Sequence, residues 1–223
     1  LPEGFADFSV RPLPGRDWAD DRRHYVVSRV EPYGPNRAAL GLDLATEPVR
    51  RAAAEASRDS GQPRLSGRIV LVQDSRQRSG FLLFFPVYRE GVQPADTAGR
   101  RAALVGWVQA SFVAERFFAE AGAHQRQVAL TVYAGESTDP AQLMYVSEGG
   151  GSAIGTSRIE LAGQPFTLGW ERGPEFVPTD RFGAAVAGVS LALVSLFLAG
   201  LVSTLQSTGR RAGEIAAVST RDL

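Results

Sequence analysis

The amino-acid sequence predicts an α+β protein that is followed by one transmembrane helix. A helical segment early in the chain precedes a series of adjacent strand candidates, which is the element order of an α+β fold. In the last two candidates, Ser157–Gly163 and Gln164–Gly173, apolar residues recur at every second position, as in strands with one buried face. From Gly183 to Gln206 no charged residue occurs, and such a run is long enough to cross a bilayer as a helix.

The N-terminal segment, residues 1–24, is rich in proline, glycine and charge and predicts a connector, with a short helix at Trp18–Arg23. Regular structure is expected to begin at Tyr25. The run Tyr25–Pro32 is typical of a strand, and the PYGPN sequence that contains Tyr33 then predicts a turn.

The first long helix is predicted over Val49–Asp59. Thr46 is a suitable N-cap, because its side-chain oxygen can accept a hydrogen bond from a free backbone N–H of the first turn. Gly61 and Pro63 are expected to stop this helix.

Strand candidates follow in two groups, one on each side of a second helical segment at Phe112–Ala123. The candidate strands are residues 68–73, 81–88, 103–112, 128–135, 143–149, 157–163 and 164–173. Arg89–Arg101 predicts a polar loop within the first group. The region before the membrane is therefore expected to form two halves, residues 25–111 and 112–178, each with a helix and an antiparallel sheet.

The transmembrane helix is predicted over residues 182–206. Arg210 and Arg211 follow it, and basic residues favour the cytoplasmic side. This orientation predicts that residues 1–178 are extracytoplasmic, in a periplasm, and that residues 207–223 begin a cytoplasmic signalling linker. The alternative, an apolar helix buried in a large soluble core, requires more sheltering chain than the rest of the sequence supplies.

Composition excludes several functions. The formal net charge is zero, which gives no basic face for nucleic acid, and the absence of cysteine removes thiol nucleophiles and thiolate metal ligands. His24 and His124 lie far apart without metal-ligand spacing, and both are expected to be solvated surface residues. We therefore expect no catalytic residue, metal site or cofactor in this chain.

Four segments in a fixed order carry a family resemblance. They are NRAALGLDL at 36–44, SGQPRLSGRIVLVQ at 60–73, GFLLFFPVYR at 80–89 and GWVQASF at 106–112. Together they resemble the CHASE domain, the extracellular sensory module of histidine kinases and nucleotide cyclases that includes plant cytokinin receptors. The resemblance is close over Tyr25–Phe118. It implies a membrane-distal PAS-like half that binds the ligand, a membrane-proximal PAS-like half, a homodimer, and an N-terminal stalk helix that is expected to be missing or truncated here.

The resemblance also implies ligand-binding residues. In cytokinin-binding members an aspartate and a leucine backbone hold the adenine ring, and these roles fall on Asp43 and Leu65. An ionised carboxylate suits this task, because it accepts hydrogen bonds from purine N–H groups. The apolar walls are expected to come from one face of the 81–88 strand and from the strand before it. The candidates are Leu71, Leu83, Phe85 and Val87, or the alternating neighbours Leu82, Phe84 and Tyr88. The alternative for Asp43 is an Asx-type turn residue that satisfies local backbone N–H groups and contacts no ligand.

Two functions follow from these observations. The first is a ligand-gated sensor that binds a small molecule, such as an adenine-like compound, and transmits the signal across the membrane to a histidine kinase or cyclase output beyond this chain. The second is a dimerisation or protein-docking ectodomain of a membrane-tethered enzyme that binds no small molecule. The homodimer and the lipid membrane are expected partners in both cases.

Overall fold

The computed structural model describes residues 8–18, 23–74, 76–92, 94–122, 126–176 and 192–197. These residues form antiparallel sheets with a small number of helices, which confirms the α+β class. Contacts divide the chain into two compact units, Leu1–Glu175 and Phe176–Leu223.

The N-terminal part of the first unit consists of short elements. Strand β1 (Arg11–Pro12) pairs in parallel with β2 (Leu42–Asp43). Between them lie helix α1 (Tyr33–Asn36), where a turn is predicted, and the 3₁₀ turn η1 (Arg37–Ala39); the 3₁₀ turn η2 (Leu44–Thr46) follows β2.

The strand predicted at Tyr25–Pro32 does not form. Only Val26 makes an isolated antiparallel bridge, to Asp43. Backbone hydrogen bonds join Tyr25 and Val27 to residues 41–44. The pairing extends no further because β2 is two residues long and the chain turns into η2 directly after Asp43.

Helix α2 (Pro48–Ser60) has its N-cap one residue later than predicted. The carboxylate of Glu47 accepts hydrogen bonds from the backbone N–H groups of Val49 and Arg50, at 3.2 and 3.0 Å, so Glu47 is the N-cap. The Thr46 hydroxyl is instead used outside the helix, because it donates to the carbonyl oxygen of Asp43. Gly61 ends the helix as predicted, in the left-handed conformation with φ of 72°.

The first sheet is built around strand β5 (Ser79–Tyr88). It pairs antiparallel with β6 (Leu104–Val113) and with the two short strands β3 (Arg64–Leu65) and β4 (Ile69–Val70). The strand predicted at 68–73 is thus reduced to two residues.

Helix α3 (Thr97–Ala103) replaces the C-terminal part of the predicted polar loop. Asp96 caps it by accepting from the N–H of Gly99 at 2.7 Å.

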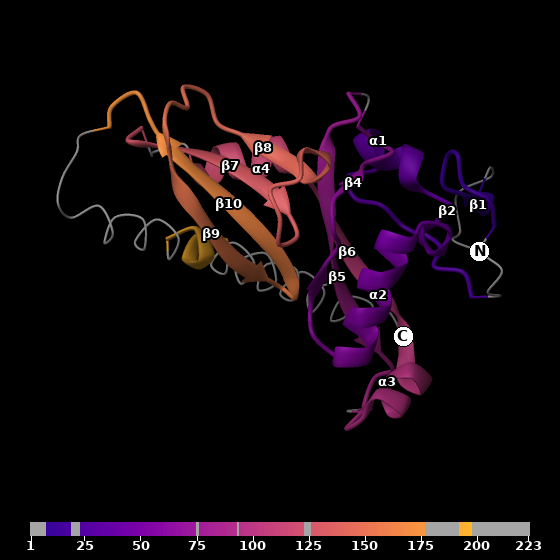
Figure 1. Ribbon diagram of the computed structural model, residues 1–223. Coiled ribbons are helices and arrows are strands. Elements are labelled where there is room, and N and C mark those ends of the chain that lie inside the picture. Colours follow the sequence, from indigo (N-terminus) through magenta and orange to yellow (C-terminus); the bar gives the residue numbers. More distant parts are fainter. Residues whose placement is uncertain are drawn as a thin grey trace, which may run out of the picture. The chain divides into compact units, whose positions relative to one another are not determined.

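One face of the first sheet packs against α2, as Figure 1 shows. The hydroxyl of Ser57 on this helix donates to the carbonyl oxygen of Phe84. The buried core between them includes Leu44, Ala54, Leu71, Leu82 and Phe84, with Tyr25 and Trp107 packed at its margin.

The second sheet follows helix α4 (Ala114–Gly122). Its strands are β7 (Val128–Ala134), β8 (Leu143–Val146), β9 (Ala153–Leu161) and β10 (Gln164–Arg172), with the 3₁₀ turn η3 (Pro140–Gln142) before β8. The order is β8-β7-β10-β9, all antiparallel. Aromatic rings connect the two sheets: Phe81 of β5 lies 6.2 Å from Phe166 of β10 between ring centroids, and both rings contact Phe118 of α4.

Most of the predicted transmembrane helix lies outside the described residues. Within it the structure describes residues 192–197, which are helical. Among the described residues no helix is both long and apolar enough to span a bilayer. The short helix predicted at Trp18–Arg23 also falls largely outside the described residues, since 19–22 are not among them.

Candidate functional site

Asp43 is fully buried, and both of its carboxylate oxygens have partners within the protein. Oδ1 accepts from the backbone N–H groups of Tyr25, at 2.8 Å, and Ala45, at 3.0 Å. Oδ2 lies 2.7 Å from Nδ1 of His24. The bond from Ala45 caps the 3₁₀ turn η2, which is the local turn geometry considered as the alternative for this residue.

His24 is more than the solvated surface histidine that the sequence predicts. Its side chain is 47% exposed, but Nδ1 reaches inward to the buried Asp43 carboxylate. The ring also meets the indole of Trp18 edge-on, with centroids 5.5 Å apart. The histidine therefore orients toward a buried carboxylate, a contact between distant sequence positions that spacing alone does not reveal.

Leu65 lies on the short strand β3 with its side chain in the core, 4% exposed. The resemblance implies that the Leu65 backbone contacts a ligand. In the structure the backbone N–H of Leu65 donates to the carbonyl oxygen of Ala162 at 3.0 Å. Ala162 belongs to the turn between β9 and β10, so this N–H already connects the two sheets.

The predicted wall residues do not share one face. Leu71 belongs to the core between the sheet and α2, together with Leu82 and Phe84. Because side chains alternate along a strand, Leu83 and Phe85 point to the opposite face of β5.

Tyr88, the last predicted wall residue, follows an irregularity in the pairing of β5 with β6. Its hydroxyl donates to the carbonyl oxygen of Arg58 near the end of α2, at 2.6 Å. Burial raises the pKa of this phenol.

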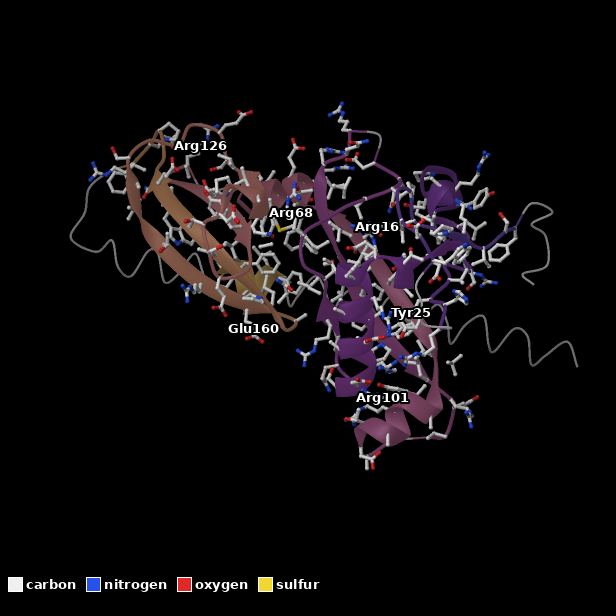
Figure 2. The ribbon with its side chains drawn as sticks, turned by 45° about the vertical axis from the view of Figure 1, so that its right-hand side comes forward. Arg16, Tyr25, Arg68, Arg101, Arg126 and Glu160 are labelled. Carbon is white, nitrogen blue, oxygen red and sulfur yellow. The ribbon has the colours of Figure 1, made fainter. Side chains whose placement is uncertain are left out.

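The α2 face of the sheet carries an aromatic pair that sequence reasoning missed. The rings of Tyr25 and Trp107 lie 4.7 Å apart. The indole N–H donates to the carbonyl oxygen of Ala54, and the Tyr25 hydroxyl donates to Oε1 of Glu55 at 2.9 Å. Burial and the neighbouring Glu55 carboxylate raise the pKa of Tyr25. Figure 2 shows Tyr25 beside α2, the helix that provides Glu55.

Gln109 on β6 provides an unsatisfied acceptor on this same face. It lies opposite Phe84 in the antiparallel ladder, and directly opposed side chains share a face of the sheet. Its Oε1 atom is buried and accepts no hydrogen bond from any residue that the structure describes. A buried amide oxygen without a donor is unfavourable, so the atom is suited to a donor from outside the chain. The alternation of Trp107, Gln109 and Ser111 along the strand is the signal that could have identified this residue.

These groups form a continuous arrangement. Asp43 accepts from the backbone of Tyr25, whose ring packs on Trp107, and Gln109 lies two positions further along β6. Among the described residues no group of three or more metal-ligating side chains gathers, here or elsewhere. Within this arrangement, the buried side-chain acceptor that lacks a partner among the described residues is Oε1 of Gln109.

Comparison with known proteins identifies the family of the chain. No curated protein matches the chain. The CHASE domain family matches residues 2–145, which include the first sheet, helix α4 and the start of the second sheet. Domains of this family are sensory domains of signalling receptors, usually extracellular, and the chain belongs to the CHASE domain family.

Proposed function

We propose that this chain is the extracytoplasmic ligand-sensing part of a membrane-bound receptor of the histidine kinase or nucleotide cyclase type. It binds a small molecule in its first half, residues 25–111, and acts as a homodimer. The observation that carries the ligand-binding role is the buried, unpaired Oε1 of Gln109 beside Trp107, within a family of sensory domains.

The chemistry of the α2 face favours a planar ligand with N–H donors. Gln109 Oε1 accepts one hydrogen bond, and the aromatic surfaces of Tyr25 and Trp107 favour a flat ring. Asp43 offers a second acceptor if a ligand N–H replaces His24 at Oδ2, because Oδ1 is held by two backbone N–H groups. An adenine derivative has these properties, and Leu65 then contributes through its backbone, as the resemblance implies.

The membrane and the output are part of the proposal. The uncharged run 183–206 and the arginines after it support a span with its C-terminal end in the cytoplasm. A ligand changes the output only if it binds one conformation of the domain more tightly than the other.

The test is thermal unfolding of the full chain with a panel of adenine derivatives and other small heterocycles. A compound at ~100 times its dissociation constant stabilises the protein by about 2.7 kcal/mol. Replacing Gln109 by leucine removes the unpaired acceptor, so the unliganded protein is expected to melt at the same or a higher temperature while the ligand-induced shift is lost.

The matched control is Gln142→Leu, an exposed position in η3 that lies in the second half of the chain, and it should leave the shift unchanged. A shift that survives in Gln109→Leu places the ligand elsewhere.

A second function, a docking or dimerisation ectodomain, is favoured by a different observation. Val87 on β5 and Val108 on β6, which lie on the face of the sheet opposite α2, are 39 and 58% exposed. Under this function no compound of the panel shifts the melting temperature, and replacing Val108 by serine weakens self-association in analytical ultracentrifugation.

A further inference from the structure

The turn between strands β9 and β10 contacts the strand on which a ligand contact is predicted. We infer that this turn, Leu161–Gln164, is the element through which a movement of β3 reaches β10. The inference rests on the proposed function for the origin of the movement, whereas the contact itself is a property of the fold.

The backbone of Leu65 faces this turn. Ser66 donates its N–H to the carbonyl oxygen of Leu82, so in the antiparallel pair Ser66 points its backbone groups toward β5. Because this direction alternates along a strand, Leu65 points its N–H and C=O away from β5, to the outer edge of β3. There the N–H donates to Ala162 at 3.0 Å.

The turn is shaped to fit against β3. Its two residues, Ala162 and Gly163, have φ of 46° and 75°, and such left-handed pairs close two-residue hairpins with the twist of the strands. The side chain of Arg64 lies directly over Gly163: a Cβ atom at this position would stand 2.8 Å from Cδ and 2.9 Å from Cζ of the arginine, and would overlap its Nη1 atom. Glycine therefore leaves the space over the turn that the Arg64 side chain occupies.

The turn is well placed to pass a displacement onward. It joins β9 directly to β10, and β10 is an inner strand that pairs with both β7 and β9. Strand β10 ends at Arg172, four residues before Phe176, where the second unit of the chain begins. A hydrogen-bonded ladder on both sides makes β10 move as one body with its sheet.

Other contacts between the sheets lie away from Leu65. The guanidinium of Arg68, labelled in Figure 2, donates through Nε to the carbonyl oxygen of Leu143 at 3.0 Å, and Phe81 packs on Phe166. These contacts hold the sheets together whether or not the turn is docked. The turn, by contrast, contacts the Leu65 backbone itself. A ligand that binds at this edge of β3 therefore changes the free energy of docking the turn, and the docked turn changes the binding free energy of the ligand by the same amount.

The experiment measures amide hydrogen exchange in the full chain for three variants. Gly163→Ala places a methyl group against Arg64, and the amide of Leu65 should then exchange on the order of tenfold faster, as expected for one lost hydrogen bond. Arg64→Ala combined with Gly163→Ala removes the obstruction and should return the rate toward that of the unchanged chain. Gly135→Ala is the control, because Gly135 has a similar φ of 89° but open space around its Cα, and it should leave Leu65 unaffected.

An unchanged Leu65 rate in Gly163→Ala, or an equal increase in Gly135→Ala, overturns the inference. With a compound that shifts the melting temperature, the exchange of β10 should change in the unchanged chain and not in Gly163→Ala. Binding without any change in β10 also overturns the inference. If no compound binds, the proposed function fails, and the Leu65 rates of the three variants still decide for or against the coupling element.

Discussion

Replacing Asp43 by alanine is expected to destabilise the protein far more than the loss of an ordinary turn residue. A surface Asx turn contributes about 1 kcal/mol. Asp43, however, is completely buried and accepts from the N–H groups of Tyr25 and Ala45 as well as facing His24.

The magnitude follows from the groups left behind. Each buried N–H without an acceptor costs about 1–3 kcal/mol, and a hydrogen bond to a charged group contributes about 1.5–3 kcal/mol. Some of this loss is recovered if water enters the space, so the expected loss is about 3–5 kcal/mol. That is a large fraction of the roughly 5–15 kcal/mol by which domains are stable.

Urea unfolding followed by tryptophan fluorescence measures this loss. Asp139→Ala is the matched control, because Asp139 also caps a 3₁₀ turn, by accepting from Ala141 at 2.8 Å, but is exposed, so its loss should be about 0.5–1 kcal/mol. Asp43→Asn keeps an oxygen for both backbone donors and should fall between the two, which preserves the comparison if the alanine variant does not fold. A loss in Asp43→Ala no larger than in Asp139→Ala would refute the reasoning.

Three further predictions concern the first sheet and its helices. Hydrogen bonds from Arg101 and Arg58 hold the carboxyl pKa of Asp59 well below its usual value. The stability that this carboxylate provides is therefore present above the unfolded pKa of about 4 and lost as the pH falls below it. In Asp59→Asn the unfolding midpoint, measured by circular dichroism, should therefore fall less steeply at acid pH than in the unchanged chain. Trp107→Phe removes an indole hydrogen bond to a carbonyl of α2 and should cost about 1 kcal/mol in urea titrations, whereas an unchanged midpoint contradicts the contact. Gly61→Ala forces a side chain into the left-handed region and should lower the unfolding free energy by about 1 kcal/mol in the same titration; a neutral effect would show that the helix ends differently.

Several features were predictable from the sequence because they depend on local patterns. Gly61 marks the end of α2, since glycine adopts the left-handed conformation without steric cost. The apolar runs at 81–88 and 103–112 predict strands, which β5 and β6 confirm, and the alternation in β10 predicts a strand with one buried face. Four short segments in order were enough to indicate the family, and residues 2–145 match it.

Other features follow from contacts between positions far apart in the sequence. The cap of α2 is Glu47 because the hydroxyl of Thr46 is used by Leu13 and by Asp43, and no local pattern encodes the arrival of residue 13. The prediction of a strand at 25–32 was wrong for a similar reason. Its pairing partner, β2, ends after two residues, and only an isolated bridge from Val26 to Asp43 forms.

The candidate site also combines features that follow from local sequence with features that depend on distant contacts. In the sequence, Asp43 is marked by the family resemblance, which implies a ligand contact, and by its place ahead of the helix, which favours an Asx turn. Only the tertiary structure brought His24 to its second oxygen, placed α2 against the face of Leu82 and Phe84, and left Oε1 of Gln109 without a donor among the described residues. Hydrophobic pattern and turn chemistry act over a few residues, whereas the partner of a buried polar atom depends on the path of the whole chain.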